Sequence, residues 1–287
     1  MASQTTQTIP ILLYHSISDS ASEEFLPYSL SPAMFEQHMA YLHTENFSPM
    51  TVSQFVIARN QGQLPDKPVV VTFDDGLRDF YTYALPVLQR YQIPATMYVV
   101  AGYVGKTSLW LQPEGEGDRP MMTWAQLKEI AAAGIEIGAH TMSHPQLDVV
   151  SQHAASEEIH ESKKRLEAGL SLPVTSLAYP HGYHSGAIIR FAQDAGFTSA
   201  CAVKNAMSVP DDDLFALARV TIFNDCDVDH LADILVGKDV PVTWQNETVK
   251  TKIWRMVRRL KQGRSPIPLA LTGLVLTLPL FENLAGS

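Results

Sequence analysis

Residues 68–76 read PVVVTFDDG, an uncharged run rich in β-branched residues that ends in two adjacent carboxylates, Asp74 and Asp75. Such a run is typical of a buried β-strand, and Gly76 marks the turn behind it. Unpaired charges at the end of a buried strand would be costly, so both carboxylates need partners. A metal ion could take one, while the other stays ionised as a general base on the attacking water. The alternative is a helix N-cap beside a surface carboxylate.

Short apolar runs alternate with helical patterns on both sides of this strand. We predict strands at residues 9–14, 68–73, 95–100, 135–139, 175–179, 198–203 and 218–223. Helices are predicted from Ser31-Pro32 onward and at residues 80–91, 123–133, 151–170 and 185–195, with Pro86 interrupting the second. This alternation favours right-handed βαβ units and a parallel sheet. We therefore predict an α/β fold, a distorted (β/α) barrel with its chemistry at the carboxyl ends of the strands.

A histidine pair follows the predicted strand at residues 135–139. His140 and His144 are four residues apart, which places both imidazoles on one face of a turn and within reach of one metal. Capping or surface histidines are the alternative. Two histidines and one aspartate provide three protein ligands and leave a position for water or substrate.

Three further groups fall at predicted strand ends. His15 could protonate a leaving amine, because the pKa of histidine lies near neutrality. The turn Tyr179-Pro180-His181-Gly182 could aim a backbone N–H at a carbonyl oxygen. A buried Arg219 would need an acidic partner and could orient Asp74. A structural histidine, a plain loop and a pair with another carboxylate are the respective alternatives.

Together these motifs resemble the NodB-type polysaccharide deacetylases. The matching segments, in the family's order, are Thr72-Phe73-Asp74-Asp75-Gly76, His140-Thr141-Met142-Ser143-His144-Pro145, Tyr179-Pro180-His181-Gly182, Asp194-Ala195-Gly196-Phe197 and Leu217-Ala218-Arg219-Val220, all within residues 9–235. The resemblance implies a NodB homology domain with seven parallel strands. It implies hydrolysis of the acetamide of N-acetylated sugars, of exopolysaccharide or cell-wall type.

The resemblance also implies roles for individual residues. Asp75, His140 and His144 correspond to the ligands of a divalent metal, commonly zinc. Asp74 corresponds to the base, and the backbone N–H of His181 to the group that stabilises the oxyanion.

Two departures from the family pattern concern the groups around the metal. Many members carry an arginine that contacts the base where this chain has Ala178, and Arg219 could replace it. Many members supply the acid from a late Leu-x-His motif, which does not occur after Arg219. The opening Leu12-Leu13-Tyr14-His15-Ser16-Ile17 instead resembles the subgroup that acts on poly-N-acetylglucosamine, in which the early histidine is the acid. We therefore predict His15 as the acid.

The predicted substrate is an N-acetylated oligo- or polysaccharide. Trp110 is expected to contact it, because aromatic faces pack on sugar rings; the alternative for this residue is the core. Tyr179 and Pro180, beside His181, are expected to contact the substrate as well. Residues 110–122 predict a binding loop over the site.

Length and composition allow one large α/β domain or two small ones. The chain has 287 residues, 46% of them apolar, and a formal net charge of −9, which speaks against a nucleic-acid partner. Two cysteines, Cys201 and Cys226, leave the redox compartment open. We predict a flexible N-terminus at residues 1–8, the deacetylase domain at 9–245 and a tail at 246–287.

The tail concentrates charge and apolar character. Seven of the 21 basic residues lie within residues 250–264, and an uncharged apolar run follows at 267–281. The basic part has an amphipathic helix pattern, and the apolar run is shorter than the roughly 20 residues of a spanning helix. We therefore predict peripheral membrane contact through residues 250–281; the alternative is a helix packed on the acidic barrel.

Membrane contact would suggest a second substrate class, a lipid-linked amino sugar that is deacetylated or deformylated. A third hypothesis is a barrel that binds carbohydrate without catalysis. We find no secretory signal at the N-terminus, so the predicted location is cytoplasmic or membrane-associated.

Overall fold

The computed structural model describes residues 8–242 of the chain. These belong to one compact unit, Met1–Glu247. Residues 1–7 and the predicted tail at 246–287 lie outside the described residues, so the predicted domain boundaries stay predictions. Within residues 8–242, no helix has the length and apolar character needed to cross a membrane.

Parallel strands form the centre of this unit. Across residues 8–242, seven of them follow one another in the order β10-β1-β5-β6-β7-β8-β9, and β4 pairs with β5 beside this path. Their bounds are β1 (Ile11–Tyr14), β4 (Ser48–Met50), β5 (Pro68–Phe73), β6 (Thr96–Val99), β7 (Glu136–Ala139), β8 (Ser176–Ala178), β9 (Ser199–Cys201) and β10 (Val220–Thr221). The sheet curls, so that Leu217, just before β10, forms a parallel bridge with Cys201. This half-barrel confirms the predicted α/β fold with seven parallel strands.

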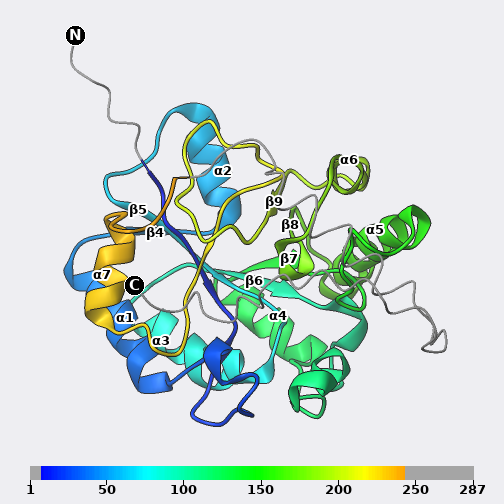
Figure 1. Ribbon diagram of the computed structural model, residues 1–287, viewed down its shortest axis with the longest axis horizontal. Helices are drawn as coiled ribbons and strands as arrows, with labels where there is room; N and C mark the ends of the chain where they lie inside the picture. Colours follow the sequence, from blue (N-terminus) through cyan, green and yellow to red (C-terminus); the bar gives the residue numbers. More distant parts are fainter. Residues whose placement is uncertain (1–7, 243–287) are drawn as a thin grey trace, which may run out of the picture. The chain divides into compact units, whose positions relative to one another are not determined.

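Helices run round the outside of the strands (Figure 1). They are α1 (Pro32–Thr44), α2 (Val52–Gln61), α3 (Leu85–Arg90), α4 (Trp124–Ala132), α5 (Gln152–Leu170), α6 (Gly186–Asp194) and α7 (Val228–Leu235). Side-chain caps begin two of them: Ser31, as the sequence predicts, accepts a hydrogen bond from the Met34 amide, and Ser151 accepts one from the Ala154 amide. The predicted helix at 80–91 is instead two pieces, a π-helix (Phe80–Ala84) followed by α3, with Pro86 in the first turn of α3.

The sequence analysis did not predict two segments of regular structure. Strand β4 and helix α2 occupy residues 48–61, where we expected no element, and Thr51 begins α2 with a capping box to Gln54. A small second sheet pairs β2 (Ser16–Ile17) with β3 (Ser29–Leu30), and the short 3-10 helix η1 (Leu26–Tyr28) lies between them. This small sheet extends the chain beyond the carboxyl end of β1.

The central strands are buried, and a polar side chain within them, such as Thr72, donates to a backbone carbonyl of the neighbouring strand. All six residues of β5 are buried, as expected for a parallel strand covered on both faces. Register then aligns the residues that come after each strand: Tyr14 pairs with Phe73, so His15 and Asp74 leave the sheet side by side. Leu13 pairs with Thr221, which brings Phe223 to the other side of His15. The predicted site residues therefore share one edge of the half-barrel.

Candidate metal centre

Asp75, His140 and His144 converge behind strands β5 and β7. One potential ligand atom from each lies within 4.8 Å of the others. Oδ1 of Asp75 is 3.5 Å from Nε2 of His144 and 3.8 Å from Nε2 of His140. The structure thus brings together the three residues predicted as metal ligands.

Unusual backbone conformations aim these side chains. Asp75 and His144 have φ values of 77° and 63°, in the left-handed region that non-glycine residues rarely adopt. Such conformations persist where surrounding contacts hold them. Here the Glu158 carboxylate of α5 accepts hydrogen bonds from the amides of Met142 and Ser143, each at 2.8 Å. The sequence prediction missed Glu158, because only the fold places α5 under the histidine turn.

The chemical state of the two imidazoles suits metal binding. Nδ1 of His140 lies 2.8 Å from the carbonyl oxygen of Ala178 and donates to it, which leaves Nε2 to face Asp75. Burial lowers the pKa of His140. Burial, together with the neighbouring His140 and His181, lowers the pKa of His144 well below its usual range. Neutral imidazoles are the form that binds a metal.

Asp75 lacks the partner that a buried carboxylate needs. Its Oδ1 is buried and has no hydrogen-bond partner within residues 8–242. Burial, reinforced by the charge of Asp74, raises the pKa of Asp75 to about 8. A cation between Asp75 and the two imidazoles would relieve this cost. Two nitrogens and one oxygen form the ligand set of a catalytic zinc-type site, so these residues fit a divalent cation.

Asp74, in contrast, already has a charged partner, because Arg219 donates to both of its carboxylate oxygens. Nη1 donates to Oδ1 at 2.6 Å and Nη2 to Oδ2 at 2.8 Å, and Arg219 is completely buried. Burial would raise the pKa of Asp74, but the attraction and hydrogen bonds of Arg219 lower it overall. Arg219 therefore contacts Asp74 in place of the arginine that many family members carry at the position of Ala178. Of the two alternatives for Arg219, the structure selects Asp74.

His15 lies next to this pair. Its Nδ1 is buried without a hydrogen-bond partner in the described part of the chain. Burial lowers its pKa to about 4, against the charge of Asp74, which raises it. The ring packs edge-on against Tyr28, with 5.2 Å between centroids. The structure thus places His15 at the site, and its role as the acid stays a prediction.

The turn Tyr179-Pro180-His181-Gly182 follows β8. His181 adopts a φ of 56°, and its ring lies 4.9 Å from that of His144, so the turn reaches the metal centre. A Cβ on Gly182 would lie 2.3 Å from the Val203 nitrogen, so only glycine fits there. Tyr179 is fully buried and its hydroxyl donates to the Phe215 carbonyl at 3.0 Å, while Pro180 is buried too. These two side chains therefore pack beneath the turn, and their contact with the substrate stays a prediction.

The predicted loop over the site contains the 3-10 helix η4 (Leu109–Glu114). Trp110, within it, packs 5.6 Å from the His144 ring, and its buried Nε1 has no hydrogen-bond partner within residues 8–242. Among the predicted substrate-binding side chains, Trp110 is the one that borders the metal centre.

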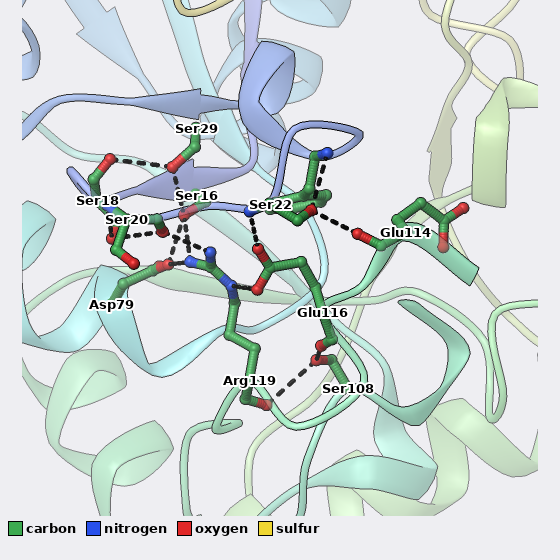
Figure 2. A network of polar contacts seen from close by, with 11 residues as sticks. Ser16, Ser18, Ser20, Ser22, Ser29, Asp79, Ser108, Glu114, Glu116 and Arg119 are labelled. Atoms are coloured by element: carbon green, nitrogen blue, oxygen red, sulfur yellow. Dashed lines mark hydrogen bonds and ion pairs between the residues drawn. The ribbon is translucent and has the colours of Figure 1, made fainter. Parts of the chain in front are cut away.

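Polar contacts fasten this loop to the small sheet and to the turn after β5 (Figure 2). Arg119 donates from Nη1 to Asp79 at 3.0 Å and to the Ser16 hydroxyl at 2.9 Å, and from Nε to Glu116 at 3.0 Å. Its Nη2 reaches the Ser20 carbonyl at 2.7 Å. The sequence prediction missed this cluster; the three-residue spacing of Glu116 and Arg119 was the available signal.

Comparisons with known proteins agree with this geometry. Residues 61–200 match the family described as polysaccharide deacetylase. The Bacillus subtilis protein YxkH, itself assigned to the polysaccharide deacetylases, is 29% identical over 215 residues, covering 75% of this chain and 71% of its own. The poly-beta-1,6-N-acetyl-D-glucosamine N-deacetylase of Staphylococcus aureus strain MSSA476 is 25% identical over 215 residues, covering 72% of each chain. The structure of the Streptococcus pyogenes deacetylase PplD, solved with acetate, superimposes with a TM-score of 0.70 at 26% identity, covering 80% of this chain and 99% of that one.

Proposed function

The chain belongs to the polysaccharide deacetylase family, as a hydrolase of carbon–nitrogen bonds in N-acetylated sugars, and we propose that its substrate is poly-N-acetylglucosamine. The observation that carries the proposal is one site in which Asp75, His140 and His144 adjoin an ionised Asp74. Two features support this polymer: the Staphylococcus aureus relative is named for it, and His15 lies where an early acid is needed.

Asp75, His140 and His144 would hold the metal, with zinc as the ion that their donor set favours. Such a cation supplies a Lewis acid, which polarises the acetyl carbonyl and makes water a better nucleophile. The chain's own contribution is the ligand geometry: the Ala178 carbonyl orients His140, and Glu158 holds the turn that carries His144.

Asp74 is the proposed base. Arg219 holds both carboxylate oxygens, so Asp74 stays ionised and its orientation is fixed. It accepts a proton from the attacking water as the water oxygen bonds to the acetyl carbon. The carbonyl oxygen gains negative charge in this step, and the backbone N–H of His181 is the proposed hydrogen-bond donor to it.

His15 is the proposed acid. When the bond between the acetyl carbon and the sugar nitrogen breaks, the nitrogen must gain a proton to leave as an amine. Burial lowers the pKa of the free ring to about 4, so the ring must gain this proton during the reaction, and the negative charge of the neighbouring Asp74 favours that protonation. The products are acetate and the free amino sugar.

Acetate release from a panel of N-acetylated sugars tests the substrate. We expect the metal-loaded protein to release acetate from β-1,6-linked N-acetylglucosamine oligomers faster than from chitin oligomers, with loss of activity in a chelator and recovery on adding zinc. Faster release from chitin oligomers would reject the proposed polymer. No release from any acetylated sugar at full metal occupancy would instead favour a barrel that binds carbohydrate without catalysis.

The predicted membrane contact through residues 250–281 stays a prediction, because those residues lie outside the described ones. So does the lipid-linked substrate that would follow from it, together with the cytoplasmic or membrane-associated location. No contact within residues 8–242 favours that second substrate over the polymer.

A further inference from the structure

Two aromatic rings remain exposed at the edge of the site. Tyr28, at the end of η1, is 40% exposed, and Phe223, just after β10, is 37% exposed. Their ring centroids lie 5.8 Å apart, and the Tyr28 ring also contacts His15. We infer that Tyr28 and Phe223, here called the aromatic platform, bind the sugar unit next to the one that is deacetylated. This inference rests on the proposed function and adds a subsite to it.

The strand register makes the platform continuous with the catalytic groups. Strand β1 lies between β5 and β10, so His15 leaves the sheet with Asp74 on one side and Phe223 on the other. A sugar whose amide nitrogen meets His15 would therefore place its neighbour in the polymer over the platform. Aromatic faces suit this occupant, because the C–H face of a pyranose is apolar while its rim is polar.

Backbone and ring contacts hold the platform in place. The Asn224 amide donates to the Pro27 carbonyl at 2.9 Å, which ties η1 to the segment that follows β10. Beneath Tyr28, the buried ring of Phe25 lies 6.0 Å away, and the Arg119 guanidinium covers Phe25 at 5.2 Å. Arg119 is itself fixed by the network of Figure 2. A surface fixed before binding loses less conformational entropy when a ligand binds to it.

The charges around the platform identify which ligand it suits. Residues 20–28 and 222–230 contain no lysine or arginine, whereas Glu23, Glu24 and Asp225 are exposed. An acidic rim repels an anionic lipid surface. It accepts a neutral acetylated chain, and it attracts one that already carries glucosamine, whose amine is a cation. The occupant is therefore a poly-N-acetylglucosamine chain, which becomes partly cationic as the reaction proceeds.

Kinetics against chain length test the platform. We expect Tyr28→Ala and Phe223→Ala each to lower the ratio of kcat/KM on the β-1,6-linked pentamer to kcat/KM on the N-acetylglucosamine monosaccharide, which has no neighbouring unit, by about tenfold. The conservative changes Tyr28→Phe and Phe223→Tyr should keep this ratio. Tyr83→Ala removes an aromatic of similar exposure outside the platform and is the matched control. Equal losses on pentamer and monosaccharide, or no loss on either, would overturn the inference.

Binding measurements separate this inference from the proposed function. Pentamer affinity is measured by calorimetry in the zinc-loaded Asp74→Asn protein, which needs no turnover. If the wild type releases no acetate but the pentamer binds and Tyr28→Ala abolishes binding, the proposed function fails and the platform stands. Absence of pentamer binding overturns the platform. Co-sedimentation of the full chain with anionic phospholipid vesicles that is lost in Tyr28→Ala, with unchanged pentamer kinetics, would assign the two rings to a membrane surface instead.

Discussion

A buried and a half-buried arginine–aspartate pair lie on either side of the turn after β5, and they differ in how the arginine contacts the carboxylate. Arg219 directs two nitrogens to the two oxygens of Asp74, at 2.6 and 2.8 Å. Arg119 divides its nitrogens among Asp79, Glu116, the Ser16 hydroxyl and a backbone carbonyl. The first pair lies inside the barrel, and the second lies between loops.

The two aspartates respond in opposite directions. Burial favours the neutral form of both, but two short charged hydrogen bonds from Arg219 outweigh it and lower the pKa of Asp74. Arg119 and Ser16 both donate to one oxygen of Asp79, and burial still raises the pKa of that residue. A bidentate pair thus keeps a buried carboxylate ionised, whereas a shared arginine mainly joins segments. We expect the first pair to control catalysis and the second to control stability.

The largest effect should come from removing the base. We expect Asp74→Asn to lower kcat by about two to four orders of magnitude, because the amide cannot accept the proton of water. Metal content, measured by elemental analysis, should stay near one ion per chain, since the three proposed ligands remain. Turnover near that of the wild type would reject Asp74 as the base, and loss of the metal would mean that Asp74 is itself a ligand.

A smaller effect should follow from weakening the paired hydrogen bonds that Arg219 donates to Asp74. We expect Arg219→Lys to lower kcat by about 10- to 100-fold, because an ammonium keeps the charge but cannot hold both oxygens in one plane. KM on the disaccharide should change little if Arg219 acts only through Asp74. A rise in KM with unchanged kcat would instead indicate that Arg219 contacts the substrate. Arg90→Lys, at an exposed arginine of α3, is the control.

Site residues that directly follow a strand were predictable from the sequence. A buried apolar strand is easily recognised, and the charged residues behind it lie at its carboxyl end. Asp74, Asp75, His140 and His144 each follow a strand, and their convergence followed from the expected parallel sheet. The need of a buried arginine for a carboxylate predicted an acidic partner for Arg219, with Asp74 as one candidate among all the carboxylates. The choice of Asp74 among them required the curl that brings β10 beside β1.

The roles of loop residues were not predictable in this way. A loop sequence does not indicate whether a given side chain is buried or exposed. Tyr179 was expected to meet the substrate, yet its hydroxyl binds the carbonyl of Phe215, a residue 36 positions later. Tyr28 and Phe223 were not singled out, because only the register of β1 and β10 places them together at the site. Arg119 went unnoticed because its partners come from three separate segments.

The smallest effect on catalysis, and a measurable one on stability, should come from Arg119→Met. We expect the free energy of unfolding at pH 7 to fall by about 1–3 kcal/mol, because Asp79 then keeps only neutral donors, the Ser16 hydroxyl and the Ile17 amide. The pKa of Asp79 is already raised by burial, so its ionised form costs stability, and this cost develops as pH rises past the unfolded pKa. Removing Arg119 enlarges that cost, so the loss should shrink toward pH 4, where Asp79 can take up a proton. Urea denaturation across this pH range, repeated with Asp79→Asn and with the double variant, measures the coupling between Arg119 and Asp79. A loss of unfolding free energy that is equal at pH 4 and pH 7 would show that Arg119 stabilises the loop through packing on Phe25 alone.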